Sequence, residues 1–123
     1  MLTLCFETDR TKLISVYSAL KINGEIAGAN FLFLDNDICV GLWRMKIVDK
    51  VGCVDKIAFC DCVDNDDRNF FFRAMLFKLQ IAENIKLRIL GEHNELSQFG
   101  FKLVDGNTEI NSADINLHNC CKG

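Results

Sequence analysis

A strand, an acidic loop and a long helix are predicted in succession between Asp55 and Asn84. Apolar and polar residues alternate from Lys56 to Val63, as they do in a half-buried strand. From Asn69 to Ala82 the apolar side chains recur at helical spacing. Asp66 or Asp67 can accept hydrogen bonds from the first turn, so the sequence predicts a well-defined helix start.

The start of this helix is the place where an anion would bind. The first N–H groups of a helix lack partners and its dipole is positive there, so loops that lead from a strand into a helix often hold phosphates. This loop contains Asp64, Asp66 and Asp67. The carboxylates could bind a cation or cap the helix, and we favour capping because the spacing of a calcium loop is absent.

The composition is that of a globular protein. Of 123 residues, 50% are hydrophobic and 25% are charged, and the formal net charge is −3. Lys and Arg are scattered, which argues against a nucleic-acid partner, and no apolar run approaches the roughly 20 residues of a membrane span. Without a secretion signal, we expect one cytoplasmic domain over residues 1–123. Its seven cysteines are expected to be free thiols.

Most other elements are predicted as strands. Asn23-Gly24 is a strong hairpin signal, because both central residues of a type I′ turn need a positive φ. Gly28 is expected to allow a close approach of backbone or of a bulky side chain. Strands are predicted at 2–7, 12–22, 25–34, 38–48, 85–90, 101–104 and 109–117. Between them we expect a polar turn at 8–11, turns at 35–37 and 105–107, and a break at Asp49 and Gly52. Residues 91–98 are expected to hold little more than one helical turn. The predicted fold class is α+β: a mixed, mostly antiparallel sheet with one main helix and one parallel strand pair joined through it.

Short stretches of sequence carry a resemblance to a known superfamily. They are DKIAF at 55–59, RAMLFKL at 73–79 and FGFK at 99–102. In this order they resemble the GNAT N-acetyltransferases, and INGEIAG at 22–28 looks like the second and third strands of that family. The similarity covers about residues 12–105. It implies a GNAT-like fold that binds acyl-CoA and transfers the acyl group to an amine.

The loop before the long helix departs from the family pattern. The family has Arg or Gln, two residues, Gly, one residue, then Gly or Ala, and these glycines let backbone N–H groups close on the pyrophosphate of the cofactor. The matching stretch, Val63 to Asn69, has no glycine and contains three aspartates. Each carboxylate near a pyrophosphate would cost on the order of 1 kcal/mol, and Arg68 is the only cation in this stretch. Tight pyrophosphate binding is therefore not expected.

Two further departures concern catalysis. The general-acid tyrosine of the family corresponds to Leu96, and the only tyrosine, Tyr17, lies in a predicted strand. The family has a pair of helices between its first two strands, where this chain has only the turn Thr8 to Thr11. One wall of the acceptor site is then missing unless a partner subunit supplies it. We assign no catalytic residue. His93 is the one candidate for a general base, and the alternative interpretation is that His93 is a solvated residue in a turn.

A zinc site is the other chemistry that the cysteines could support. Cys60 and Cys62 share one face of a predicted strand, and His118, Cys120 and Cys121 lie together near the C-terminus. The two-residue gaps of structural zinc pairs are absent. We therefore expect no metal, and interpret the first pair as buried thiols and the second group as part of a polar tail.

Two functions from different classes follow from these observations. The first is a GNAT-like, acetyl-CoA-dependent N-acetyltransferase domain with weakened or lost activity, whose partner is an amine or another small-molecule acceptor. Main-chain groups of 60–63 would hold the pantetheine arm and 63–70 the phosphates. The second is a non-catalytic GNAT-derived module for binding or homodimerisation. The residues expected to hold acetyl-CoA are Cys60, Cys62, Val63, Arg68, Asn69 and Phe70.

Overall fold

The computed structural model describes residues 1–82 and 84–117, which belong to two compact units. Unit 1 comprises Met1–Lys46 and Lys56–Phe71, and unit 2 comprises Ile47–Asp55 and the chain from Phe72 onward. None of the described helices is long and apolar enough to cross a membrane. The single domain over residues 1–123 stays a prediction.

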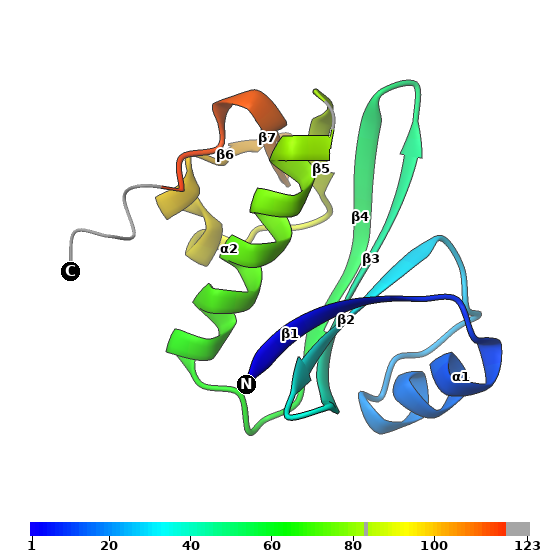
Figure 1. Cartoon of the computed structure of the whole chain (residues 1–123). Helices are drawn as coiled ribbons and strands as arrows, with labels where there is room; N and C mark the ends of the chain where they lie inside the picture. The colour runs from blue at the N-terminus through cyan, green and yellow to red at the C-terminus, as the bar shows by residue number, and fades with distance from the viewer. Residues whose placement is uncertain (83, 118–123) are drawn as a thin grey trace. The chain divides into compact units, whose positions relative to one another are not determined.

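The fold is α+β with a mixed, mostly antiparallel sheet, as predicted. Hydrogen-bonded strands follow the order β1-β2-β3-β4-β5-β7-β6. The pairs β1–β2, β2–β3, β5–β7 and β6–β7 are antiparallel, whereas β4–β5 is parallel and joined through α2. The elements labelled in Figure 1 are β1 (Leu2–Glu7), α1 (Arg10–Ala19), β2 (Ala29–Asp35), β3 (Ile38–Val48), β4 (Val51–Phe59), α2 (Asn65–Ala82), β5 (Lys86–Ile89), β6 (Lys102–Val104) and β7 (Asn107–Asn111), with short 3₁₀ turns η1 (Asn94–Phe99) and η2 (Ser112–Asp114).

The hairpin of β2 and β3 in unit 1 forms as the sequence predicts. Its turn residues Asn36 and Asp37 have φ of 50° and 69°, the positive values that a two-residue hairpin turn requires. Asp35 pairs with Ile38 across this turn, and β1 pairs with the other side of β2 from Leu2↔Asp35 to Glu7↔Asn30. Confirmed turn chemistry therefore fixes the register of this part of the sheet.

The strand predicted at residues 12–22 is wrong, because helix α1 occupies most of this stretch. Asp9 caps the helix: its Oδ1 accepts hydrogen bonds from the N–H groups of Thr11 (2.9 Å) and Lys12 (3.4 Å). Leu13 and Tyr17, one turn apart, are the buried residues of the helix. A capped start and one buried stripe outweigh the β-branched residues that suggested a strand.

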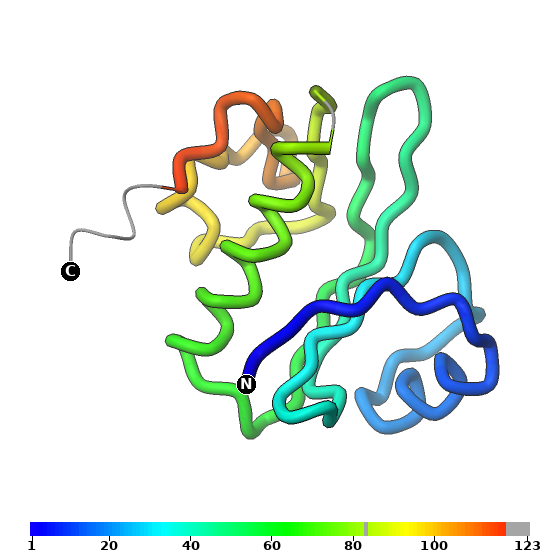
Figure 2. The backbone as a smooth tube through the Cα atoms, in the orientation of Figure 1, coloured from blue at the N-terminus to red at the C-terminus, as the bar shows by residue number. Residues whose placement is uncertain are grey.

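The hairpin predicted at Asn23-Gly24 is also wrong. Gly24 has the expected positive φ of 95°, but residues 20–28 form no strand, and their backbone follows an irregular path between α1 and β2 (Figure 2). Since β2 begins at Ala29, the match of residues 22–28 to two strands of the GNAT family fails as well. One helix, α1, thus stands where the sequence predicts only a turn between the first two strands.

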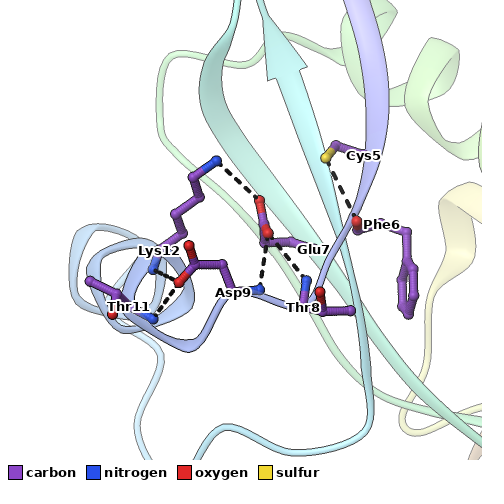
Figure 3. A network of polar contacts seen from close by, with 7 residues as sticks. All are labelled: Cys5, Phe6, Glu7, Thr8, Asp9, Thr11 and Lys12. Atoms are coloured by element: carbon purple, nitrogen blue, oxygen red, sulfur yellow. Dashed lines mark hydrogen bonds and ion pairs between the residues drawn. The ribbon is translucent and has the colours of Figure 1, made fainter.

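Glu7 ties the end of β1 to the start of α1 (Figure 3). Its Oε2 accepts hydrogen bonds from the N–H groups of Thr8 (3.2 Å) and Asp9 (3.1 Å), and its Oε1 lies 3.9 Å from Lys12 Nζ. The Glu7 side chain is only 14% exposed. This network positions Asp9 to cap α1, which is why the chain turns into a helix directly after β1.

Two groups of side chains contribute to the core of unit 1. Helix α1 packs onto the sheet through a cluster of Leu13, Tyr17, Ile22, Leu32 and Leu42. Elsewhere the Phe33 ring stacks on Phe59 and on Phe71, with centroids 5.3 Å and 4.9 Å apart. The start of α2 is therefore anchored to β2 and β4 by aromatic contacts.

Gly28 confirms the close approach predicted for it. A Cβ at this position would lie 2.8 Å from the carbonyl oxygen of Met45 on β3, and the φ of Gly28 is +65°. Both the space and the backbone conformation exclude a side chain without local movement. The irregular segment before β2 therefore lies directly against the backbone of β3.

In unit 2, the turn between β3 and β4 differs from the prediction by two residues. Asp49 and Lys50 have φ of 51° and 62° and make the turn, while Gly52 lies inside β4. Strand β4 then ends at Phe59, not at Val63. Because the strand is shifted toward the N-terminus, its first half pairs with β5, from Val51↔Lys86 to Val54↔Ile89.

The second half of α2 belongs to unit 2 and is fixed there by polar and apolar contacts. Gln80 Nε2 donates to the carbonyl oxygens of Ser112 (3.2 Å) and Ile115 (3.0 Å). Leu76, Leu87 and Ile89 are at most 1% exposed. The strand predicted at 109–117 is shorter than expected, because β7 ends at Asn111 and η2 follows it.

Candidate functional site

The candidate site is the loop of unit 1 between the end of β4 and the start of α2. The N–H of Cys60 donates to the Val40 carbonyl oxygen (2.8 Å), and the N–H of Val63 donates to the Cys60 carbonyl oxygen (3.2 Å). The chain therefore turns away from the sheet immediately after Phe59. Two of the main-chain N–H groups that were expected to face a pantetheine arm are used within the protein.

Helix α2 begins four residues earlier than predicted, and Asp64 caps it rather than Asp66 or Asp67. The Asp64 carboxylate accepts a hydrogen bond from the N–H of Asp67 (2.9 Å), and the Arg68 N–H donates to the Asp64 carbonyl oxygen (3.0 Å). An anion at this helix start would need such first-turn N–H groups. A carboxylate of the chain itself already occupies one of them.

The potential around this helix start is negative. Burial raises the pKa of Asp67, and the charges of Asp64, Asp35 and Asp66 raise it further. Asp35 comes from the far end of β2, and no local sequence signal linked it to this loop. A pyrophosphate placed here would face the carboxylates of two separate elements.

Arg68 is the cation of this loop, and its guanidinium lies over an aromatic ring. Its Cζ is 4.8 Å from the centroid of the Phe59 ring, which is a cation–π distance. Asn69 and Phe70 follow on α2, and the Phe70 side chain is 42% exposed. The six residues expected to hold acetyl-CoA thus lie in one continuous segment, and their role stays a prediction.

Cys60 and Cys62 form a disulfide, so the expectation of free thiols is wrong for this pair. Their Cα atoms are 5.5 Å apart, within the normal range for a bonded pair. They do not alternate on a strand, as the sequence suggested, because β4 ends one residue before Cys60. Cys5, Cys39 and Cys53 are free thiols, as predicted.

No metal centre is assembled among the residues that the structure describes. Within them, no three His, Cys, Asp or Glu side chains lie in an arrangement that could hold an ion. His118, Cys120 and Cys121, the second half of the zinc hypothesis, fall outside the described residues.

His93 lies in unit 2 beside a small cavity. Its Nε2 is 3.0 Å from the Leu90 carbonyl oxygen, and because a carbonyl only accepts, Nε2 carries a proton. The cavity, which Ser97 and Phe101 also line, has a volume of about 50 Å³. Small-molecule sites usually measure hundreds of cubic ångströms.

Leu96, which takes the place of the family's tyrosine, is fully buried. Catalysis by His93 stays a prediction.

A larger cavity of unit 1 lies where α1 follows β1. Its volume is about 350 Å³, and Phe6, Glu7, Arg10 and Asn30 are among its lining residues. This cavity is not expected from the sequence, because the prediction of a strand at residues 12–22 leaves no helix beside β1. The size suits a small molecule, and both a carboxylate and a guanidinium belong to the wall.

A buried carboxylate of unit 2 was missed as well. Glu109 on β7 is 8% exposed and accepts from Arg88 Nε (2.8 Å), and Lys86 Nζ lies 3.1 Å from its other oxygen. The hydrogen bond from Arg88, followed by that from Lys86, lowers the pKa of Glu109. All three side chains have partners, which is typical of an ion network that stabilises a sheet.

Comparison with protein-family models and with curated protein sequences finds no match. Solved structures do match. YhhK of Escherichia coli, solved bound to coenzyme A, has a TM-score of 0.64 at 10% identity, with 89% of this chain and 97% of that chain covered. The GNAT family N-acetyltransferase YhbS of Escherichia coli, in complex with CoA, has a TM-score of 0.64 at 14% identity, with 94% and 84% covered.

The chain has the GNAT fold. A third similar structure, a mutant of the AtaT toxin bound to the C-terminus of the antitoxin AtaR and to acetyl-CoA, has a TM-score of 0.60 at 9% identity, with 100% of this chain and 99% of that chain covered. These matches confirm the fold that the resemblance implied. The loop before α2 and Leu96 are places where this chain departs from the pattern of that family.

Proposed function

We propose that this chain is a GNAT-type acyl-CoA N-acyltransferase domain in which cofactor binding, and with it acyl transfer to an amine, is weakened or lost. The fold supports the acyl-CoA class, since similar structures were solved with CoA or acetyl-CoA. The hydrogen bond from the Asp67 N–H to the Asp64 carboxylate carries the proposal of weakness.

The residues of the loop fit a pyrophosphate poorly. A phosphate would have to displace the Asp64 carboxylate from the helix start and would still face Asp66 and Asp67. Arg68, the cation of the loop, lies over Phe59. Repulsion between each carboxylate and the pyrophosphate costs on the order of 1 kcal/mol. Several carboxylates together therefore offset most of the attraction that one cation and the helix dipole provide.

Calorimetric titration with acetyl-CoA tests this proposal. We expect a Kd no tighter than about millimolar, or roughly −4 kcal/mol. The double substitution Asp66→Asn and Asp67→Asn keeps the Asp64 cap and should tighten binding roughly tenfold at low salt, with a smaller gain at high salt. Asp105→Asn, the same change of charge in a turn of unit 2, is the matched control and should have no effect. A low-micromolar Kd for the unmodified chain would contradict the proposal.

A non-catalytic module that binds a second copy of the chain is the other candidate. Two large apolar side chains one turn apart on α2, Phe77 and Ile81, are 54% and 67% exposed. Apolar pairs of this kind favour contact with another protein surface. Sedimentation of the unmodified chain and of Ile81→Glu would test it: a dimer that the substitution dissociates supports the module, and a monomer at high concentration rejects it.

A further inference from the structure

The disulfide of the loop before α2 differs from one that staples a fold. Cys60 and Cys62 enclose a single residue, Asp61. The chain-entropy stabilisation from so short a loop is roughly half of that from a 15-residue loop. Cys62 and Asp61 are exposed and Cys60 is partly exposed, so a small reagent can reach the sulfur of Cys62. The pair is therefore accessible and adds little structural constraint.

The two free thiols described in unit 1 are poor candidates to reduce this disulfide. Cys5 and Cys39 in unit 1 pack against the core cluster of α1, and Cys39 Sγ donates to the Gly41 carbonyl oxygen at 3.3 Å. Burial raises the pKa of the Cys39 thiol, so less of it is present as the reactive thiolate. Neither of these two thiols of unit 1 is therefore well suited to attack the disulfide, and we consider a thiol from solution.

The charges beside the disulfide select among such thiols. Asp61 separates the two cysteines, Asp64 caps the helix that follows, and Asp66 and Asp67 lie in its first turn. A thiol that carries a negative group is repelled by this cluster, and one that carries an amine is attracted. The effect acts over roughly 10 Å at 0.1 M salt and over only about 3 Å at 1 M salt.

We propose that Cys60–Cys62 is a thiol–disulfide exchange site for small, positively charged aminothiols. The thiolate of the aminothiol attacks Sγ of Cys62, a mixed disulfide forms there, and Cys60 leaves as a thiolate. A second aminothiol thiolate then attacks its counterpart in the mixed disulfide, which releases the aminothiol disulfide and leaves both cysteines reduced. The reverse steps consume the aminothiol disulfide and restore Cys60–Cys62, so no other oxidant or reductant is needed.

Mass spectrometry of the full chain with two thiols of similar size tests the site. The probes are cysteamine, which is cationic, and 3-mercaptopropionate, which is anionic, with rates compared per thiolate. We expect reaction with cysteamine to be about tenfold faster at low salt, and the ratio to approach one in 1 M salt. Acid quenching and digestion should place the adduct on Cys62, and a cysteamine–cystamine mixture should set the ratio of dithiol to disulfide reversibly.

Substitutions separate the site from general thiol reactivity. Cys53→Ser, in unit 2, should keep the reaction unchanged, whereas Cys62→Ser should abolish it. Asp66→Asn with Asp67→Asn should reduce the preference for cysteamine while circular dichroism stays that of the unmodified chain. Equal rates for the two thiols at low salt, an adduct on another cysteine, or no Cys60–Cys62 disulfide at any cysteamine–cystamine ratio would overturn the proposal.

Discussion

Asp67 is less stable as a carboxylate in the folded chain than in an unfolded one. Burial, and then the charges of Asp64, Asp35 and Asp66, raise its pKa. A raised pKa means that the folded state binds this proton more tightly than the unfolded state does. Protonated Asp67 therefore contributes its full share to the free energy of unfolding below the pKa of the unfolded state. This contribution is lost as the pH rises through the pKa of the folded state. We therefore expect the ionised Asp67 to oppose folding at neutral pH.

Replacing Asp67 by Asn should therefore raise the free energy of unfolding at pH 7, because Asn cannot ionise. The gain should vanish below about pH 3.9, where aspartate is protonated in both states. Urea unfolding at pH 7 and pH 3.5 measures both values, with Asp105→Asn as the charge-matched control. A variant that is less stable than the unmodified chain at pH 7 would show that attraction to the helix dipole outweighs the repulsion.

At the residue scale, the loop before α2 could be singled out from the sequence, but the bonds within it could not. The acidic residues and the cysteine pair were recognised from composition and spacing. That Asp64 caps the helix and that Cys60 bonds to Cys62 depends on β4 ending at Phe59, and the alternation of residues 56–63 concealed that end. The pairing of Glu109 with Arg88 could not be predicted, because the sequences of β5 and β7 do not by themselves determine the register between these two strands.

At the scale of elements, two similar turn signals had opposite outcomes. Residues 35–37 lie between apolar stretches that each have a sheet partner, and they form the predicted hairpin. Asn23-Gly24 is a similar turn signal, but the preceding residues form α1, because Asp9 caps the start of this helix and Glu7 holds the N–H of Asp9. A turn signal fixes a local conformation, and the elements on either side decide whether strands meet there.

Substitution of Gly28 measures how tightly the segment before β2 lies against β3. Gly28→Ala places a Cβ 2.8 Å from the Met45 carbonyl oxygen, whereas Gly24→Ala, also at positive φ, meets nothing within 4 Å. Both variants bear the cost of a left-handed backbone, about 1–2 kcal/mol. We expect Gly28→Ala to lower the free energy of unfolding by roughly 1 kcal/mol more than Gly24→Ala does. Equal losses in chemical denaturation would refute the close approach.

At the scale of the whole molecule, each passage of the chain from one unit to the other falls inside a regular element. The passages are at 46/47 in β3, at 55/56 in β4 and at 71/72 in α2. Unfolding of either unit would therefore break hydrogen bonds of elements that the other unit also contains. The two units are expected to unfold together, in agreement with the prediction of a single domain.

Coincident unfolding curves from two probes would support that expectation. Trp43, fully buried in unit 1, reports on that unit by fluorescence, and far-UV circular dichroism reports on the helices and strands of both. We expect the same urea midpoint from both probes within error. Two separated midpoints, or a fluorescence change that precedes the loss of ellipticity, would mean that the units unfold independently.

The same alternation of the chain has a consequence for folding during synthesis. Domains commonly fold in order as they leave the ribosome. Here the aromatic stack of Phe33 with Phe59 and Phe71 cannot close until Phe71 has emerged, and by then residues 47–55 of unit 2 are already outside. A nascent chain that stops at Lys46 therefore exposes Phe33 without these aromatic partners.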